Sequence, residues 1–449
     1  MNPKIRMLEQ TLRRLIRRRA IVPLVKVITK AHSADLGFLL TRFSEMERNE
    51  IIQHCANDEQ RSQVIAEAEL HIATQVLTSL QPEKAVELLC LMEPDDVSDI
   101  LENLPEELAG DLLRRMRRSD RTEVEELARY DSATAGGIMS PRFFALNRDI
   151  TAKEAIEHLQ HMGTDLEMVF YVYVVNELEQ LLGVVSLRQL VVTKPETRLF
   201  DLMTSDVISV TPEVDQEEVA KLASRYGLLA VPVVDDSNKL VGIVTVDDVI
   251  DVLREEATED ILRMAGAGDE LVGQETVLGS AISRFPWLLV TCVAGAVGVA
   301  LLSVYADTIT RHLPMLYFIP VVLGLAGITG LQSSTIIGQR MIQGRRGYFQ
   351  LFRQVGAAFL LGLIFGTLLG AADWFFWLRP LENEGFTKAV MLGLGLTGAM
   401  TAAAALGGFL PLFFARIRVD PAFGSGPIAA VLADVIGLLL YLSIASSGV

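Results

Sequence analysis

One carboxylate lies in the middle of a long apolar segment of this 449-residue sequence. The segment GSGPIAAVLADVIGLLLYLSI runs from Gly424 to Ile444, with Asp434 at its centre. An ionisable group at mid-bilayer costs about 2.5–3.5 kcal/mol even on insertion scales, so it normally faces an ion pathway or a partner rather than lipid. We therefore hypothesise that Asp434 lines a cation pathway. The alternative is a structural carboxylate, neutralised by a hydrogen bond or by a cation on another helix.

A second set of carboxylates precedes the apolar part of the chain. Its members are Asp248, Asp251, Glu255 and Glu259, flanked by Glu256 and Asp260. Steps of three and four residues place the first four on one face of a helix, where like charges are mutually destabilising. We call these six residues the acidic stripe. The stripe is either a solvated helix face or a site that needs a cation as counter-charge.

Five apolar segments must position the buried carboxylate. They are Phe285–Ala306, Pro314–Gly338, Val355–Leu378, Ala389–Phe414 and Gly424–Ile444. Each is long enough for a bilayer of about 30 Å, which needs roughly 20 residues of helix. No Lys or Arg interrupts the first four, which favours a pathway role for Asp434. Residues 276–449 are therefore predicted to form a membrane domain of five helices.

The loops between these segments predict an orientation. Arg340, Arg345, Arg346 and Arg353 follow the second span, and Arg416 and Arg418 follow the fourth. By the positive-inside rule both loops are cytoplasmic. The N-terminal part is then cytoplasmic too, and the C-terminus lies outside. No signal peptide is expected at the basic start of the chain, because Lys26 and Lys30 break the apolar stretch there.

Composition excludes several classes of function. Residues 31–275 hold 49 Asp and Glu against 21 Lys and Arg, a balance that disfavours nucleic acid and favours cations. Cys55, Cys90 and Cys292 show no paired spacing for a disulfide or a zinc site. The sequence also lacks a Walker lysine loop, a catalytic triad and clustered His ligands. We therefore expect no enzymatic activity.

Residues 1–130 are predicted to form short amphipathic helices. Pro82, Pro94 and Pro105 recur every 11 or 12 residues, each followed by acids and then by apolar residues at helical spacing. Proline suits the first position of a helix because its missing N–H has no partner there, and early acids suit the helix dipole. The repeat predicts a helical solenoid or compact superhelix.

Residues 131–192 and 193–254 are predicted to be tandem βαββα units. YVYVVNELEQLLGVVSLRQLV aligns with AVPVVDDSNKLVGIVTVDDVI, and both units resemble CBS domains, which commonly bind adenine nucleotides. Thr245 and Asp248 match the family's ending that hydrogen-bonds ribose and phosphate, whereas the first unit has Ser186 but Gln189 at the acidic position. The resemblance implies one possible ATP site. A purely structural pair is the alternative.

The whole chain resembles the MgtE family of magnesium channels. The matching pieces include MEPDDVSDILENLPEE, TAGGIMS, RFPWLL, PVVLGLAGITGLQSS and DPAFGSGPIAAVLADVIGLLLY. The resemblance implies a homodimer in the lipid of the cytoplasmic (inner) membrane that carries Mg²⁺. Its pore would be lined by Asp434, Gln332 and the backbone at Gly327 and Gly330, oxygen ligands that suit a hydrated Mg²⁺. Ile328 departs from the family, which has a polar Asn there.

The same resemblance implies regulation. Residues 255–275 would be a plug helix between the CBS pair and the pore. Mg²⁺ held between the acidic stripe and other acids, such as Asp95, Asp96 and Asp99, would keep the cytoplasmic domains together. When cytosolic Mg²⁺ is low, repulsion would separate them and open the pore.

The sequence thus predicts a multidomain protein with an α-helical superhelix, a CBS pair, a connecting helix and a five-span membrane domain. The favoured function is Mg²⁺ influx closed by cytosolic Mg²⁺. One alternative is a carrier of Co²⁺, Ni²⁺ or Mn²⁺, which Ile328 makes credible. Another is a membrane-tethered Mg²⁺ or nucleotide sensor that does not conduct.

Overall fold

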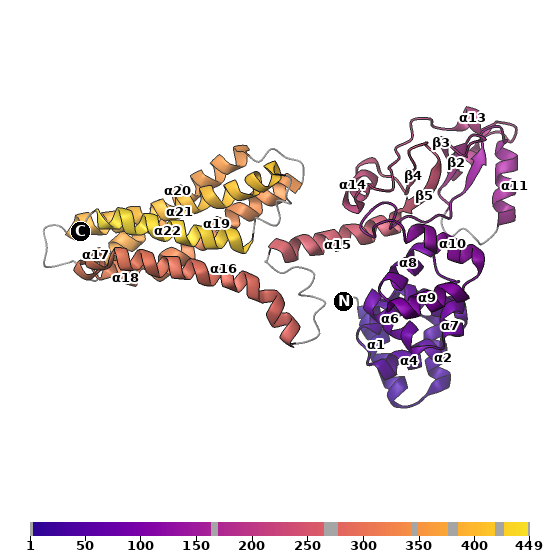
Figure 1. The fold of residues 1–449 in the computed structure, drawn as a ribbon, viewed down its shortest axis with the longest axis horizontal. Helices are drawn as coiled ribbons and strands as arrows, with labels where there is room; N and C mark the ends of the chain where they lie inside the picture. Colours follow the sequence, from indigo (N-terminus) through magenta and orange to yellow (C-terminus); the bar gives the residue numbers. More distant parts are fainter. Residues whose placement is uncertain are drawn as a thin grey trace. The chain divides into compact units, whose positions relative to one another are not determined.

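The chain forms two compact units, Met1–Arg254 and Glu255–Val449, in a computed structural model (Figure 1). The structure describes residues 3–162, 169–264, 277–342, 348–375, 385–417 and 426–447. Several sequence-predicted features therefore lie outside the described residues, among them Arg345, Arg346, Arg418 and residues 265–275 of the connecting segment.

The first unit begins with a run of short helices. They are α1 (Pro3–Arg17), α2 (Ile21–Lys30), α3 (Ser33–Leu40), α4 (Glu45–Gln53), α5 (Asp58–Ala66), α6 (Leu70–Ser79), α7 (Pro82–Leu89), α8 (Pro94–Glu102), α9 (Glu106–Arg115) and α10 (Arg118–Leu127). From α3 to α10 most helices pack on the next but one, around one core. The predicted superhelix is confirmed. Pro82 and Pro94 start helices, whereas Pro105 is the N-cap of α9.

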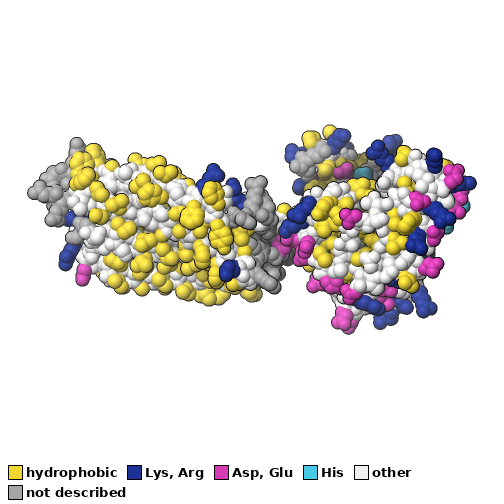
Figure 2. All heavy atoms as spheres, turned by 90° about the horizontal axis from the view of Figure 1, so that it is seen from above, with side chains coloured by type: hydrophobic (Ala, Val, Ile, Leu, Met, Phe, Trp, Pro, Cys, Tyr) yellow, Lys and Arg dark blue, Asp and Glu magenta, His cyan; other side chains and the backbone are white. Residues whose placement is uncertain are grey.

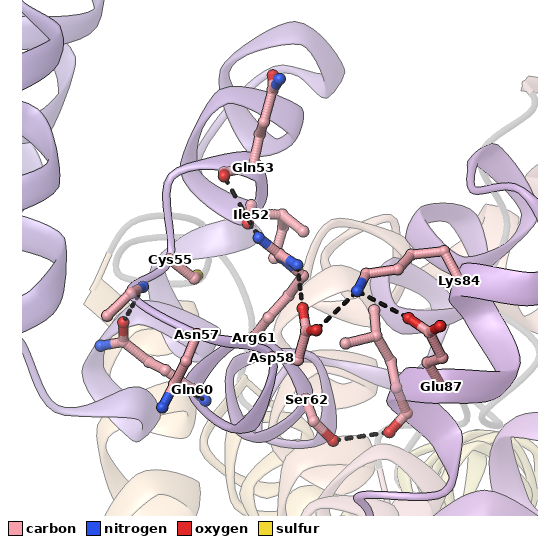
Figure 3. Close-up of polar contacts among 12 residues, drawn as sticks. Ile52, Gln53, Cys55, Asn57, Asp58, Gln60, Arg61, Ser62, Lys84 and Glu87 are labelled. Carbon is pink, nitrogen blue, oxygen red and sulfur yellow. Dashed lines mark hydrogen bonds and ion pairs between the residues drawn. The ribbon is translucent and has the colours of Figure 1, made fainter.

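Asp58 ties three of these helices together (Figure 3). Its carboxylate, at the start of α5, pairs with Arg61 and lies 2.7 Å from Nζ of Lys84 on α7. The Lys84 hydrogen bond holds the pKa of Asp58 below its usual range. Nε of Arg61 in turn donates to the carbonyl oxygen of Ile52 in α4, at 2.8 Å. These polar contacts thus link α4, α5 and α7 at the surface of the apolar core.

The second half of this unit contains the predicted tandem repeat. Its elements are β1 (Ala145–Asn147), α11 (Ala152–Met162), β2 (Tyr171–Val175), β3 (Leu181–Ser186), α12 (Leu187–Val192), α13 (Leu199–Leu202), α14 (Gln216–Tyr226), β4 (Ala230–Val234), β5 (Leu240–Thr245) and α15 (Val246–Met264). Strand β1 runs parallel to β2, and β2 and β3 are antiparallel, as are β4 and β5.

The two repeats exchange their leading segments. Ser140, near the start of the first repeat, pairs with Ile243 on β5, and Thr204, near the start of the second, pairs with Val184 on β3. The exchange depends on glycine, because a Cβ on Gly242 would lie 2.6 Å from Sδ of Met139. A Cβ on Gly183 would likewise lie 2.6 Å from Sδ of Met203. Each repeat is therefore completed by residues from the other.

The first strand of the second repeat is shorter than the sequence predicts. Val210 makes a single parallel bridge to Val233, at the position where β1 pairs with β2 in the first repeat. Pro212 follows two residues later and has no N–H to donate. A strand ladder cannot continue through that position.

The second unit is built from long apolar helices. They are α16 (Val277–Val304), α19 (Ile319–Ile342), α20 (Tyr348–Asp373), α21 (Gly385–Arg416) and α22 (Pro427–Ser446), with the short α17 (Ala306–Arg311) and α18 (Pro314–Tyr317) between the first two. Among the described residues these five long helices are apolar enough to cross a membrane. The five predicted spans are therefore confirmed. The first starts earlier than predicted, at Val277.

Small residues allow these helices to pack closely. A Cβ on Gly366 of α20 would lie 2.3 Å from the carbonyl oxygen of Gly393 on α21, and one on Gly407 would lie 2.1 Å from that of Gly330 on α19. Such close backbone approach is typical of helices packed within membranes. Figure 2 shows hydrophobic side chains covering the visible face of this unit, with charged ones gathered at its two ends.

Candidate functional site

Asp434 lies on α22 directly against the backbone of α19. A Cβ on Gly327 would be only 2.6 Å from Oδ1 of Asp434, so no larger residue fits beside this carboxylate without a shift. Oδ1 is buried and has no hydrogen-bond partner, while the side chain as a whole is partly exposed. One oxygen of this carboxylate is therefore buried and unsatisfied, while the side chain as a whole reaches the surface.

The neighbouring residues give this site its shape. A Cβ on Gly330 would lie 2.5 Å from Cβ of Ala433, the residue before Asp434. The structure thus brings Gly327, Gly330 and Asp434 to one helix interface, as the sequence predicts. Gln332 and Ile328, one turn apart, lie instead on an exposed face of α19, where Ile328 is 56% exposed. The structure does not bring Gln332 to Asp434.

A second acidic site lies inside the first unit, where the superhelix meets the second repeat. Asp95, near the start of α8, is buried, and its Oδ1 has no hydrogen-bond partner. Burial raises the pKa of Asp95 to about 6, and the nearby charge of Asp247 adds to this effect. Burial likewise raises the pKa of Asp248 to about 7, with the Asp95 charge as the next cause. Carboxylates far apart in sequence thus face each other.

Thr245 joins two of these carboxylates. Its hydroxyl contacts the carboxylates of both Asp247 and Asp248, and its backbone N–H donates to Asp248 at 3.3 Å. A hydroxyl has one proton, so it can donate to only one carboxylate at a time. The hydrogen bonds from Thr245 favour the charged form of Asp248 and so partly offset the effect of burial on its pKa. The predicted nucleotide residues Thr245 and Asp248 therefore cap α15 and face Asp95.

The rest of the acidic stripe runs along α15. Asp251 is exposed and pairs with Arg254 at 3.2 Å. Glu255, Glu256 and Glu259 follow on the same helix, and the side chain of Asp260 lies outside the described part. Asp96 and Asp99 follow Asp95 on α8. No group of three or more His, Cys, Asp or Glu side chains in the described ranges is close enough to hold a metal ion alone.

A small cavity of about 10 Å³, room for about one water molecule, lies between the two repeats. Arg142, Tyr171 and Tyr173 line it, together with Ala230 and Ile243 from the second repeat. The buried hydroxyl of Tyr173 has no hydrogen-bond partner. Arg142 also donates to Glu123 of α10 at 3.1 Å, so the cavity wall is tied to the superhelix. Thr245 and Asp248 are not part of this lining.

Sequence reasoning missed several polar groups of these sites. Asp247 could have been included because it precedes Asp248 in the first turn of α15. Arg142 carries no such signal, because its role depends on contacts with residues far away in sequence. Asp373 is a carboxylate within the predicted third span and could have been noticed as Asp434 was. It is fully buried next to His312.

Comparison with known proteins places these sites in context. Family models match residues 319–444 (MgtE, divalent cation transporter), 31–133 (MgtE intracellular N domain), and 135–193 and 199–255 (CBS domain). The magnesium transporter MgtE of Bacillus subtilis is 32% identical over 94% of this chain and 93% of its own. The MgtE of Thermus thermophilus is 36% identical over 83% of this chain and 86% of its own.

A solved structure is similar to the first unit. It is the cytosolic domain of the Mg²⁺ channel MgtE in complex with ATP, with a TM-score of 0.52 and 33% sequence identity. The match covers 54% of this chain and 99% of that one. The Bacillus subtilis and Thermus thermophilus relatives, which match most of this chain, are both named magnesium transporters.

The raised pKa of Asp248 predicts a pH-dependent stability. The folded state holds this proton more tightly than the unfolded chain, whose carboxyl has a pKa near 3.8. The contribution of this proton to folding stability, on the order of 4 kcal/mol, should therefore be intact below about pH 4 and be lost as pH rises through about 7. In Mg²⁺-free buffer, the Asp248→Asn protein should lose less thermal stability than wild type between pH 5 and 8. The exposed Asp206→Asn control should follow wild type, and equal slopes for all three proteins would contradict the prediction.

Proposed function

Because this chain belongs to the MgtE family of divalent cation transporters, we propose that it carries Mg²⁺ into the cytoplasm through a pore at Asp434. The membership rests on relatives named magnesium transporters, with 32% and 36% identity over most of the chain. The five apolar helices make it a multi-pass membrane protein. The observation that carries the pore assignment is the unsatisfied carboxylate of Asp434 against Gly327.

A pore at this position needs two copies of the chain. A single copy of the chain forms only one side of such a pore. Asp434 is partly exposed there, beside the face of α19 that carries Gln332 and Ile328. A two-fold axis along this wall doubles each group and encloses a pathway. Mg²⁺ gives up its water reluctantly and binds proteins through one or two carboxylates and retained waters. Two Asp434 carboxylates, two Gln332 amides and backbone oxygens near Gly327 and Gly330 suit that ion.

The charges at the helix ends support the proposed orientation. Arg284, Arg340, Arg353 and Arg416 lie near helix ends that alternate spans place on the same side. The opposite ends carry Arg311 and Lys388 but also Asp307 and Asp373. The more basic end is cytoplasmic by the positive-inside rule. The N-terminal domains are then cytoplasmic in the inner membrane, and the C-terminus is outside.

Cytosolic Mg²⁺ is proposed to close the pore through the acidic sites. We assign this function to five parts of the chain: the superhelix (residues 1–130), the two CBS domains (131–192 and 193–254), the connecting helix (255–275) and the membrane domain (276–449). Asp95 and Asp248 repel each other when both are ionised, and Mg²⁺ between them removes that repulsion and holds α8 to α15. Asp96, Asp99 and the acidic stripe extend the negative surface to which the ion is attracted. Low Mg²⁺ restores the repulsion and frees α15, the helix that leads to the membrane domain.

ATP is proposed as a ligand of the CBS pair. The residues around the cavity at Arg142 include a cationic group, aromatic side chains and the unsatisfied Tyr173 hydroxyl, which suit the phosphate, the base and a polar group of a nucleotide. The two repeats would have to move apart to admit one. The similar cytosolic domain was solved with ATP. Since Thr245 and Asp248 face Asp95 instead, they serve the acidic site in the conformation described here.

Replacing Asp434 tests the pore. Asp434→Ala should reduce Mg²⁺ uptake by proteoliposomes at least tenfold, because it removes the charge that attracts the ion, while Asp434→Asn should keep the fold and show a smaller residual flux. Asp307→Asn, an exposed change near a helix end, is the control and should transport as wild type. Wild-type uptake by a correctly inserted Asp434→Ala dimer would refute the assignment of Asp434 to the pore. Dimer formation and membrane insertion of each variant are checked before its uptake is compared with wild type.

Substitution of Ile328 tests whether the chain carries Mg²⁺ or instead Co²⁺, Ni²⁺ or Mn²⁺. If the exposed position of Ile328 faces the pathway, Ile328→Asn adds an amide that can bind the water shell of Mg²⁺. We expect higher Mg²⁺ flux and weaker competition by Co²⁺ or Ni²⁺. Leu331→Asn is the matched control, because Leu331 is 36% exposed on the same helix. Unchanged flux and unchanged competition would show that the departure at Ile328 is neutral, whereas Co²⁺ flux above Mg²⁺ flux in wild type would favour the other carrier.

Substitutions in the acidic stripe test whether cytosolic Mg²⁺ closes the pore through this helix. In inside-out patches, wild-type activity should fall as bath Mg²⁺ rises through about 10⁻⁴–10⁻³ M, the range of weak carboxylate sites. Replacing Asp251, Glu255 and Glu259 together by Ala should move this curve to higher Mg²⁺, because ligands are lost. The control removes the same charge elsewhere, at the exposed Glu196, Asp201 and Asp206. An identical curve in the stripe variant, or an equal shift in the control, would rule out this helix as the Mg²⁺ sensor.

A further inference from the structure

The first two helices of the chain carry a positive surface that the proposed transport does not use. Residues 1–30 contain nine Lys and Arg and one Glu, whereas the whole chain has a formal net charge of −16. The family model of the MgtE intracellular N domain begins at residue 31, so α1 and α2 precede the part that it describes. Figure 1 shows both helices at the end of the first unit away from its strands.

The fold of α1 separates its apolar residues from its basic ones. Leu12 is fully buried, and Leu8 and Ile16 pack against the same core. The opposite face of α1 is exposed and holds no acid, and α2, which packs on α1, likewise exposes basic residues. We call these exposed residues the basic surface. They are Arg6, Arg14, Arg17 and Arg18 on α1, Arg19 after it, and Lys26 and Lys30 on α2.

The acids nearby are already engaged with other arginines. Glu9 pairs with Arg13 at 3.3 Å and lies 4.0 Å from Arg42. Glu47 of α4 lies 3.8 Å from Arg13. Within the part of the chain that the structure describes, no member of the basic surface forms an ion pair. Like charges therefore gather there without a counter-charge from the protein, and the surface attracts anions.

The conformation of Arg19 shows that this charge is not needed by the turn. Its φ is 51°, its N–H donates to the carbonyl oxygen of Ile16, and the N–H of Ala20 donates to that of Leu15. This is the Schellman motif, in which glycine is usual because a Cβ is disfavoured in the left-handed region. The helix dipole favours cations in the last turn of α1, but it cannot account for Arg6 in the first turns or for Lys26 and Lys30.

Exposed apolar side chains adjoin the arginines. Ile21 is 55% and Val22 is 80% exposed, and Pro23 beside them is exposed too. Basic residues next to exposed apolar ones are typical of surfaces that bind a bilayer, where the cations attract lipid phosphates and the apolar groups enter the interface. Proteins that bind single-stranded nucleic acid usually add aromatic side chains for stacking on bases, and residues 1–30 contain none. The composition therefore favours lipid.

We propose that the basic surface docks on the headgroups of anionic phospholipids, with Ile21 and Val22 entering the interface of the bilayer. The membrane domain of the same chain tethers the first unit to that bilayer, which raises the effective concentration of lipid at the basic surface. Docking holds α1 and α2 at the membrane and supplies the missing counter-charge. That the leaflet is the cytoplasmic one rests on the proposed orientation, whereas the lipid contact itself does not.

The test compares the full-length protein in two kinds of lipid disc, one of phosphatidylcholine and one of an equal mixture of phosphatidylcholine and phosphatidylglycerol. In Mg²⁺-free buffer, hydrogen exchange of residues 17–28 should be slower in the mixed disc by about fivefold or more, the effect of roughly one basic contact. High salt should remove this difference by screening. Exchange of α7 should be equal in both discs. Equal exchange of residues 17–28 in both would overturn the proposal.

A charge variant tests the residues themselves. Replacing Arg17 and Arg18 by Gln and Arg19 by Gly removes three charges, and Gly suits the left-handed turn, so the fold should be kept. The difference between the two discs should then disappear. The control removes three exposed basic residues of the repeats, by Arg188→Gln, Lys194→Gln and Arg225→Gln, and should keep the wild-type difference. An equal loss in the control would overturn the assignment to the basic surface.

A nucleic-acid arm separates the other class of anionic partner. Binding of polyuridylate to the basic surface, combined with equal exchange in the two discs, would assign the surface to nucleic acid and overturn the proposal. The comparison of wild type in two discs holds even where the variant fails to fold. Neither readout needs transport, so a protein that carries no Mg²⁺ can still dock on lipid. A transporting protein with equal exchange in both discs would refute the docking alone.

Discussion

The sites of this molecule depend on one constraint, namely that a carboxylate removed from water must find a compensating partner. Asp434, Asp95 and Asp373 each have at least one buried oxygen without a hydrogen bond in the described structure. The protein answers this constraint differently at each place. Asp95 and Asp248 interact electrostatically, and burial raises the pKa of both. Asp434 is partly exposed, and Nε2 of His312 lies 3.4 Å from Oδ2 of Asp373.

The helices can place these groups only because small residues remove side chains from the contact. Gly327 leaves the space that Oδ1 of Asp434 occupies, and Gly330 lets Ala433 approach the same helix. In a bilayer, close packing rather than burial of apolar surface holds helices together. The glycines that build the membrane unit are therefore also the residues that determine where its charge sits. A substitution of Gly327 or Gly330 would therefore change both the helix packing and the position of the Asp434 carboxylate.

Most of the architecture could be predicted from the sequence, because its signals are local. Apolar length marks the spans, Pro82 and Pro94 mark helix starts, and the repeat in residues 131–254 marks the CBS pair. Asp434 and the acidic stripe were also recognisable from residue type and spacing. What could not be predicted depends on contacts across the chain. Two contacts arise only when separate helices pack: Asp95 with Asp248, and Asp373 with His312. The strand at Val210 is reduced to a single bridge because Pro212 cannot donate the next hydrogen bond, and this effect of the proline depends on how the strands pair.

The exchange of leading segments between the repeats has a consequence for synthesis on the ribosome. Ser140 cannot find its partner Ile243 until about a hundred further residues have been made, which takes on the order of 5–20 s at ordinary elongation rates. During that interval the first repeat is incomplete and its edge is unpaired. The pair becomes whole only as α15 is added, shortly before the first apolar helix emerges. The first unit is thus completed shortly before the first apolar helix of the second unit is made.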